Sequence, residues 1–171
     1  GRTDLTIRDS ADCGFIGGGY TEGDEGNGGS IRINKDARCT IYGTEIRRGY
    51  AERAGGGIYV AGTLNMQGGE LMLNTTGGQG GGIYCEAGGT VDLTDTLIDR
   101  NTGSDCGGIY NAGGTVALHH VTIKNNEAGS QGGAGLNNKG NAVLTDCTIS
   151  VNSCGDHGAG IYNEGPLTVT S

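Results

Sequence analysis

The stretch Gly80-Gly81-Gly82-Ile83-Tyr84 recurs with small changes along the chain. Its counterparts are Gly55-Gly56-Gly57-Ile58-Tyr59, Cys106-Gly107-Gly108-Ile109-Tyr110, Gly133-Ala134-Gly135-Leu136-Asn137 and Gly158-Ala159-Gly160-Ile161-Tyr162. Counted from the Ile or Leu, successive copies lie 25, 26, 27 and 25 residues apart, and Ile31 lies 27 residues before the first. A nearly fixed period of this size indicates a protein built from stacked structural repeats.

Further columns of apolar residues follow each glycine motif. In the first pair of columns, inward positions lie two residues apart with a mostly polar or small residue between them, which is the periodicity of a strand. The pair consists of Cys39, Leu64, Val91, Val116, Ala142 and Leu167, followed by Ile41, Met66, Leu93, Leu118, Leu144 and Val169. A third column holds Ile46, Leu71, Ile98, Ile123 and Ile149. Each repeat is therefore predicted to carry three short strands joined by glycine-rich turns.

Strands this short cannot bury their apolar faces alone, so each must stack on its equivalent in the next repeat. Glycine supplies 38 of the 171 residues, which disfavours helices because glycine costs about 1 kcal/mol per helical position relative to alanine. We predict one all-β domain over 1–171, a parallel β-helix of about six turns of about 26 residues. Residues 1–30 form an irregular first turn with an acidic glycine-rich loop, and 31–171 form the regular turns.

A second motif, apolar-x-x-Asn, follows each glycine motif. It reads Leu71-Met72-Leu73-Asn74, Ile98-Asp99-Arg100-Asn101, Ile123-Lys124-Asn125-Asn126 and Ile149-Ser150-Val151-Asn152. Together the two motifs resemble the repeats of right-handed parallel β-helix surface proteins of bacteria, such as autotransporter passengers and polymorphic outer-membrane adhesins. The resemblance covers 28–171 well and 1–27 loosely. It implies a right-handed coil and a location outside the bacterial cell or on its surface.

Stacked turns place equivalent residues about 4.8 Å apart, so recurring asparagines form rows. A side-chain amide both donates and accepts hydrogen bonds, so such a row can satisfy itself and the backbone of the turn. We predict two structural ladders. One holds Asn74, Asn101, Asn126 and Asn152, and the other holds Asn111, Asn138 and Asn163, which continue a column begun by Ile33, Val60 and Cys85.

Tyrosines form another column, whose members are Tyr59, Tyr84, Tyr110 and Tyr162, with Asn137 in the fourth place. The neighbouring isoleucines point inward, so we expect the tyrosines to point outward. The favoured interpretation is an aromatic stack that shields a strand edge. The alternative is a platform for sugar rings or a partner surface, because tyrosine combines an apolar ring with a polar tip.

Asp95, His120 and Asp146 fall in register in three consecutive turns. Such a row could hold a metal ion or take part in acid–base chemistry, although a surface charge pair is the plainer interpretation. The acidic insertion 21–27 is a candidate for weak Ca²⁺ binding, and no other cofactor is indicated.

The formal net charge of −8 disfavours binding to nucleic acid, and no apolar run is long enough for membrane insertion by this segment. The six cysteines contain no CxxC pair, which argues against a zinc site. A Cys13–Cys39 pair and a Cys147–Cys154 pair are both open alternatives, and Cys85 is predicted to be a buried thiol. The chain ends within a repeat, so we expect a fragment of a longer protein.

Three functions remain open. The leading hypothesis is a non-enzymatic, secreted or cell-surface adhesin or stalk module that presents a binding surface to a glycan or to a host or neighbouring protein. The second is a polysaccharide lyase or glycoside hydrolase of the pectate-lyase-like class, which needs carboxylates on neighbouring turns. Its nearest candidates, Asp92, Asp95 and Asp99, lie on one turn, so no catalytic residue is assigned. The third is a filament subunit that stacks end to end on itself.

Overall fold

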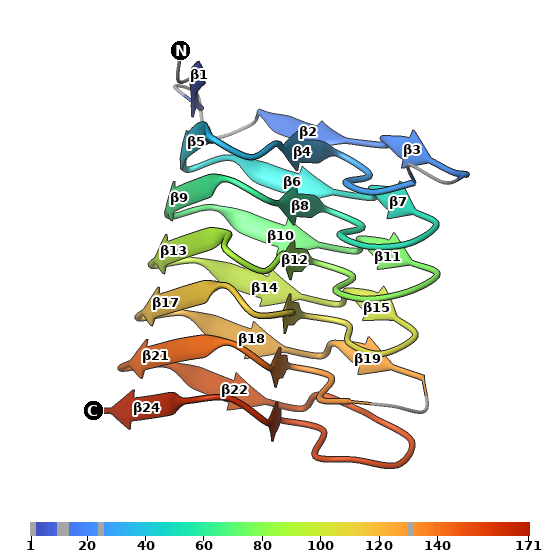
Figure 1. Cartoon of the computed structure of the whole chain (residues 1–171). Helices are drawn as coiled ribbons and strands as arrows, with labels where there is room; N and C mark the ends of the chain where they lie inside the picture. The colour runs from blue at the N-terminus through green and yellow to red at the C-terminus, as the bar shows by residue number, and fades with distance from the viewer. Residues whose placement is uncertain (1–2, 10–13, 24–25, 130–131) are drawn as a thin grey trace.

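The computed structural model describes residues 3–9, 14–23, 26–129 and 132–171, which form a parallel β-solenoid of about six turns without helices (Figure 1). The all-β prediction and its period are confirmed. No helix in these ranges has the length and apolar character needed to cross a membrane.

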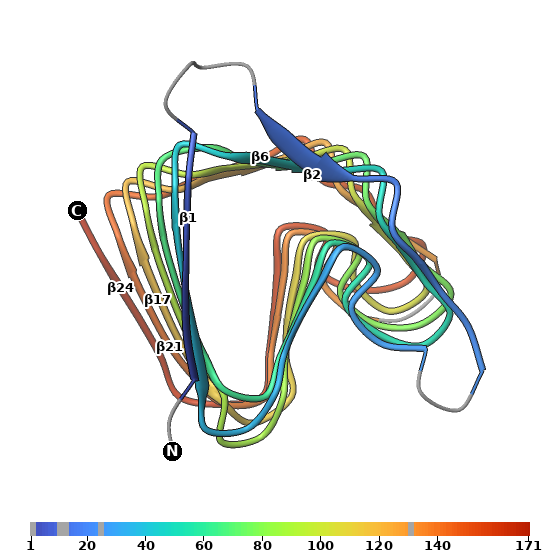
Figure 2. The same ribbon diagram turned by 90° about the horizontal axis from the view of Figure 1, so that it is seen from above.

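The turns contribute to four parallel sheets, which Figure 2 shows end-on. Sheet I contains β1 (Thr3–Arg8), β5 (Ala37–Tyr42), β9 (Thr63–Gln67), β13 (Thr90–Thr94), β17 (Thr115–His119), β21 (Asn141–Thr145) and β24 (Leu167–Thr170). Sheet II contains β2 (Phe15–Gly17), β6 (Glu45–Arg47), β10 (Glu70–Met72), β14 (Leu97–Asp99), β18 (Thr122–Lys124) and β22 (Thr148–Ser150). Sheet III contains β3 (Tyr20–Thr21), β7 (Tyr50–Ala51), β11 (Thr75–Thr76), β15 (Thr102–Gly103) and β19 (Glu127–Ala128). Sheet IV contains β4 (Ile31–Ile33), β8 (Ile58–Val60), β12 (Ile83–Cys85), β16 (Ile109–Asn111), β20 (Leu136–Asn138) and β23 (Ile161–Asn163).

Sheet III is the one addition to the three strands per turn predicted from the sequence. Its strands are only two residues long, as in Thr75–Thr76, and such a pair is too short to show an apolar alternation. They form because the turns before and after already hold their backbones in parallel register.

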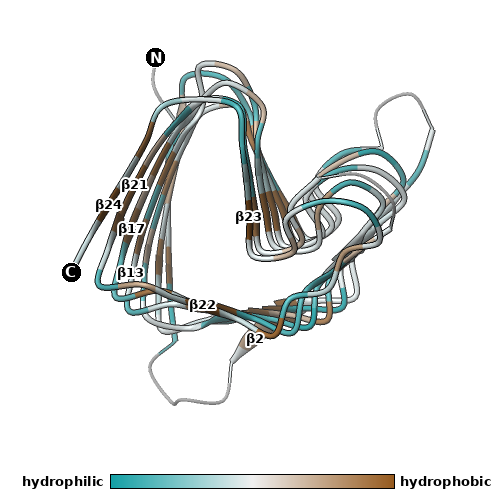
Figure 3. Cartoon of the chain, turned by 90° about the horizontal axis from the view of Figure 1, so that it is seen from below, coloured by the Kyte–Doolittle hydropathy of each residue, from teal (hydrophilic) through white to brown (hydrophobic). Residues whose placement is uncertain are grey.

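The core is built from the predicted columns. Val91 pairs with Leu64 on one side and with Val116 on the other, and Leu71 pairs with Ile46 and Ile98. All of these side chains are fully buried. Figure 3 shows brown, apolar segments along the strands of sheets I, II and IV, whereas the loops are mostly teal or white. The first turn departs from the regular spacing, because Thr3 pairs with Ala37, 34 positions later.

The glycine triplet explains the shape of the cross-section. Gly55 has a left-handed φ of 68°, and a Cβ on Gly56 would lie 2.6 Å from the carbonyl oxygen of Gly81 in the next turn. Only glycine allows this approach of backbone to backbone. The chain therefore folds inward after sheet III and enters sheet IV near the middle of the cross-section (Figure 2).

The first asparagine ladder lines the corner between sheets II and III and is confirmed. Asn101 Nδ2 donates to Asn126 Oδ1 (3.0 Å) and to the carbonyl of Leu71 (2.9 Å), while Asn101 Oδ1 accepts from the Asn74 backbone N–H (3.0 Å). Asn126 repeats the pattern with Asn152. Asn74, Asn101 and Asn126 are fully buried, so each amide satisfies backbone groups that water does not reach.

The second ladder closes sheet IV in the later turns and is confirmed too. Asn111 Nδ2 donates to Asn138 Oδ1, and Asn138 Nδ2 donates to Asn163 Oδ1, each at 2.8 Å. Asn111 Oδ1 also accepts from the Gly114 N–H at 2.8 Å. Both rows are therefore part of the scaffold.

Candidate functional site

The inward fold of the glycine triplets creates a groove along the solenoid axis. We call it the tyrosine groove, and it lies between the outer face of sheet IV and the loops that follow sheet III. Its first section is a pocket of about 480 Å³, lined by Asn27, Arg53, Ala54, Tyr59, Gln79 and Tyr84. Its second section is a pocket of about 180 Å³, lined by Asp105, Tyr110, Gly132, Asn137, Lys139, His157, Tyr162 and Glu164. Each of the two pockets is thus lined by side chains from successive turns.

Three of the four predicted tyrosines stack on one another. The rings of Tyr59 and Tyr84 have centroids 5.2 Å apart and planes 11° apart, and those of Tyr84 and Tyr110 have centroids 5.6 Å apart and planes 9° apart. The predicted aromatic stack is present. Because each ring covers the face of the next, the stack offers mainly ring edges and hydroxyl groups to the groove.

The tyrosines are less exposed than the sequence predicted. Tyr59 and Tyr110 are 8% and 5% exposed, and Tyr84 and Tyr162 are half-buried. The loops after sheet III cover them, and the sequence alternation could not reveal that cover. Burial, and secondly the charge of Glu86, raise the pKa of Tyr59 to about 12. Burial is also the main cause that raises the pKa values of Tyr84 and Tyr110, so the phenols stay neutral hydrogen-bonding groups at neutral pH.

Charged and amide side chains form the rim of the groove. Gln79 Nε2 donates to Asp105 Oδ2 at 2.8 Å, and Lys139 Nζ lies 3.2 Å from Glu164 Oε2. The Tyr162 hydroxyl donates to Glu164 Oε1 at 2.7 Å. This hydrogen bond, followed by that from Lys139, lowers the pKa of Glu164. The rim therefore carries both hydrogen-bond donors and acceptors.

The Asp95–His120–Asp146 row lies elsewhere, at the corner between sheets I and II. His120 Nδ1 lies 3.6 Å from Asp95 Oδ1, and His120 Nε2 lies 3.4 Å from Asp146 Oδ2. All three residues have left-handed φ angles of 52° to 54°, in the place that Gly43 and Gly68 occupy in earlier turns. Asp and His are among the residues that tolerate this conformation, so the corner itself accounts for their presence.

Within the described ranges, no group of three or more His, Cys, Asp and Glu side chains is arranged to hold a metal ion. Asp9, Glu45, Glu70 and Asp95 line one pocket of about 400 Å³, but Asp9 Oδ2 accepts from the Gly14 N–H and Glu45 pairs with Arg47. The proposed calcium loop includes Asp24 and Glu25, which lie outside the described residues.

The five described cysteines are all free thiols. The Cys147–Cys154 bridge, which the sequence left open, is therefore not formed: strand β22 separates the two residues, and their thiols donate to the carbonyls of Leu118 (3.4 Å) and Gly132 (2.9 Å). Cys39 is a buried free thiol, and Cys13 lies outside the described residues. Cys85 is buried as predicted, and burial raises the pKa of its thiol to about 12.

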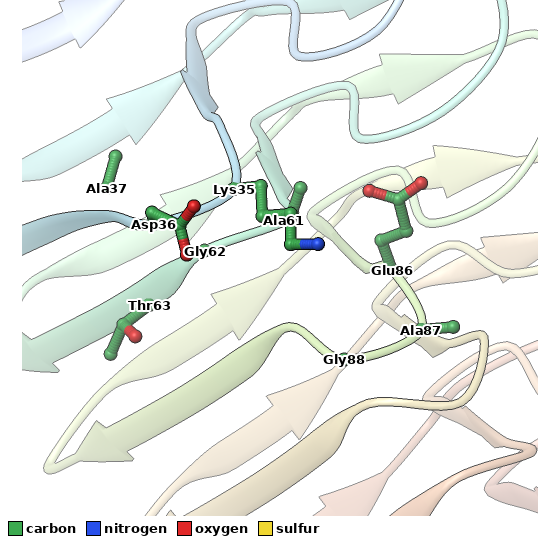
Figure 4. A pocket seen from close by; sticks show the side chains of 9 residues that line it. All are labelled: Lys35, Asp36, Ala37, Ala61, Gly62, Thr63, Glu86, Ala87 and Gly88. Atoms are coloured by element: carbon green, nitrogen blue, oxygen red, sulfur yellow. The ribbon is translucent and has the colours of Figure 1, made fainter. Parts of the chain in front are cut away.

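A further depression, of about 880 Å³, was not anticipated from the sequence. It lies over the loops from sheet IV to sheet I, where Ala61 and Gly62 form a short loop beside the longer loop 86–89 (Figure 4). Lys35 and Asp36 stand on one side of it and Glu86 on the other. Unequal loop lengths between the repeats were the sequence feature that could have revealed it.

The sequence analysis did not predict the walls of the tyrosine groove, because Arg53, Gln79 and Asp105 belong to no column of recurring apolar residues. Their shared place one or two residues before each glycine motif was the available pattern. Comparisons with known proteins found no matching family model, no matching curated protein and no matching solved structure.

Proposed function

We propose that this chain is a non-enzymatic binding module of a secreted or cell-surface bacterial protein, and that the tyrosine groove binds a glycan chain. The observation that carries the proposal is the groove itself, in which tyrosines from successive turns line a depression with a polar rim. A ligand built from similar units can repeat its contacts from turn to turn. The resemblance to bacterial surface β-helices supports the location.

The chemistry of the rim favours a glycan over an extended peptide. Amides, carboxylates and an ammonium group around Gln79, Asp105 and Lys139 suit the many hydroxyl groups of a sugar, which both donate and accept. A peptide strand would instead add to a free sheet edge and present its own backbone row. The groove lies on a sheet face, where the backbone groups already pair between turns.

The state of Glu164 supports binding over hydrolysis. A general acid for glycoside cleavage needs a raised pKa, as a carboxyl group gains in apolar surroundings. Hydrogen bonds from Tyr162 and Lys139 lower the pKa of Glu164. Its carboxylate therefore suits a hydrogen-bond acceptor for sugar hydroxyls.

A glycan array followed by calorimetry with the retained polysaccharide tests the proposal. Gln79→Trp places a large side chain on the groove wall and should weaken binding at least tenfold. Thr115→Trp, on the exposed outer face of sheet I, is the matched control and should bind like the parent. Failure to retain any glycan, or equal binding by both variants, contradicts the proposal. Incubation with polyuronates is the third arm, and cleavage products would establish the lyase or hydrolase alternative instead.

A further inference from the structure

One ring is missing from the tyrosine column. Tyr110, Asn137 and Tyr162 occupy the same register position in three consecutive turns. Where adjacent turns both carry tyrosine, the rings stack with centroids 5.2 to 5.6 Å apart. Asparagine has no ring and is several atoms shorter than tyrosine, so the aromatic stack is interrupted at Asn137. The second section of the groove, a pocket of about 180 Å³, lies at this place, and we call it the slot.

Asn137 lines the slot and carries an unpaired acceptor. The residue is only 3% exposed, and its Oδ1 has no hydrogen-bond partner among the described residues. The seven ladder asparagines, by contrast, all have amide groups engaged in hydrogen bonds. An unpaired buried acceptor costs about 1–3 kcal/mol, so the structure keeps a site here at the expense of stability. A ligand that donates a hydrogen bond would satisfy it.

We propose that the slot binds a single neutral sugar ring, which takes the place of the missing tyrosine. The ring lies between Tyr110 and Tyr162, and one of its hydroxyl groups donates to Asn137 Oδ1. This inference rests on the proposed function, because it names the place in the tyrosine groove at which a glycan inserts a ring. A sugar ring suits the slot, because it offers C–H groups to aromatic neighbours and hydroxyl groups to a polar rim.

The charges around the slot favour a neutral sugar over an acidic one. Asp105 and Glu164 contribute two carboxylates, and Lys139 contributes one ammonium group. The Lys139 Nζ already lies 3.2 Å from Glu164 Oε2 and 5.9 Å from the centroid of the Tyr110 ring. A uronate or a sialic acid would bring a further carboxylate beside these acids, which is unfavourable. Hydroxyl groups, however, can donate to the carboxylates and accept from Lys139.

Two neighbours hold the slot in shape. The ring of His157 meets that of Tyr162 at 85° with centroids 5.2 Å apart, which fixes the orientation of Tyr162. Gly132 has a left-handed φ of 91°, and a Cβ there would collide with the amide nitrogen of Asn137. The wall opposite Asn137 is therefore bare backbone, and the asparagine keeps its position.

The test is a titration of the isotopically labelled chain with the methyl glycosides of glucose, galactose, mannose and N-acetylglucosamine, followed by NMR. At least one glycoside should give saturable shifts of the Asn137 side-chain amide and of the Tyr110 and Tyr162 rings. Asn137→Tyr fills the slot with the residue that other turns carry at this register, so it should fold and should weaken binding at least tenfold. Tyr42→Phe, on sheet I, is the control and should bind unchanged.

The outcomes separate this inference from the function on which it rests. Shifts at Asn137 with phenol or adenine but with none of the glycosides overturn the sugar assignment, as do no shifts with any probe. If a polysaccharide binds wild type and Asn137→Tyr equally, while Gln79→Trp loses it, the slot proposal is wrong and the groove proposal holds. If a glycoside fills the slot but the array retains no polysaccharide, the slot stands and the groove proposal fails.

Discussion

Two corners of the solenoid are closed by stacked side chains, and they use different chemistry. Between sheets II and III, every turn from Asn74 to Asn152 carries an asparagine. At the end of sheet IV, one register position holds apolar or thiol side chains in the early turns and asparagines in the later ones. In chain order its members are Ile33, Val60, Cys85, Asn111, Asn138 and Asn163.

The backbones around the two rows differ. In the first row, the residue before each asparagine has a left-handed φ between 53° and 57°, so the corner repeats its backbone geometry in every one of these turns. The turn before them has the same geometry at Arg48 but carries Gly49 instead of an amide, and the Gly49 N–H donates to Asn74 Oδ1. In the second row, the loop to sheet I varies in length, and Gly113 and Gly114 direct N–H groups at Asn111 Oδ1. Val60 and Asn138 both precede two-residue loops, so loop length alone does not choose between an apolar side chain and an amide there.

Asn101→Leu in the first row should have the largest effect on stability. The change removes the side-chain partners of the Asn74 N–H and the Leu71 carbonyl in a region that water does not reach, whereas Asn126 Oδ1 keeps the bond from the backbone N–H of residue 101. At about 1–3 kcal/mol for each of the two buried groups, we expect a loss of about 2–6 kcal/mol in the free energy of unfolding. Urea unfolding followed by circular dichroism measures it. A loss below about 1 kcal/mol would show that the ladder does not hold the corner.

Asn138→Leu in the second row should cost less, about 2–4 kcal/mol. It removes the donor to Asn163 Oδ1 and to the Pro166 carbonyl, but Asn163 is exposed and water can replace the lost bond. Asn111 keeps its bonds to Gly114 and Asn141. The same urea experiment provides the measurement, and a loss equal to that of Asn101→Leu would remove the distinction between the two rows.

Cys85→Val, in the early part of the second row, should make the free energy of unfolding less sensitive to alkaline pH. Burial raises the pKa of the Cys85 thiol from 9.0 to about 12, so the folded state favours the neutral thiol. This contribution is fully present below pH 9 and is lost as the pH rises toward 12. Between these limits, wild type should lose about 1.4 kcal/mol per pH unit more than the variant.

Urea midpoints at several pH values between neutral and alkaline measure this difference. At neutral pH the variant should lie within about 1.5 kcal/mol of wild type, because valine already fills this register at Val60. Cys106, whose pKa is also raised to about 12, is present in both proteins and cancels in the comparison. Parallel pH profiles of the two proteins would mean that Cys85 is not sealed from solvent.

The two rows also show what the sequence could predict. The period, the apolar columns and both asparagine ladders could be predicted from residues that recur at one register position, because stacked turns bring equivalent residues into contact. The tyrosine groove did not follow, because the inward fold comes from backbone contacts of Gly55 and Gly56 that no side-chain pattern records. The unpaired Oδ1 of Asn137 was equally invisible: in the sequence it is one more asparagine, and only the three-dimensional neighbours distinguish it from Asn138.

The smallest effect on stability is expected at the corner of the first row where a β-branched residue has a left-handed φ. Val151 has a left-handed φ of 53° and is 78% exposed, although its turn demands the conformation that β-branched residues adopt least readily. Asn125 takes the same place one turn earlier. Val151→Asn should therefore stabilise the protein by about 1 kcal/mol. Asn125→Val should destabilise it by more than that, because it also removes the 2.7 Å hydrogen bond from Asn125 Nδ2 to the buried Asp99 Oδ1. Thermal unfolding of both variants measures the pair. Val151 is exposed and lies outside the ladder, so a stabilising Val151→Asn would show that the corner geometry, apart from the amides, favours asparagine before each ladder residue. A destabilising Val151→Asn would assign that choice to side-chain contacts, such as the one that Asn125 makes with Asp99.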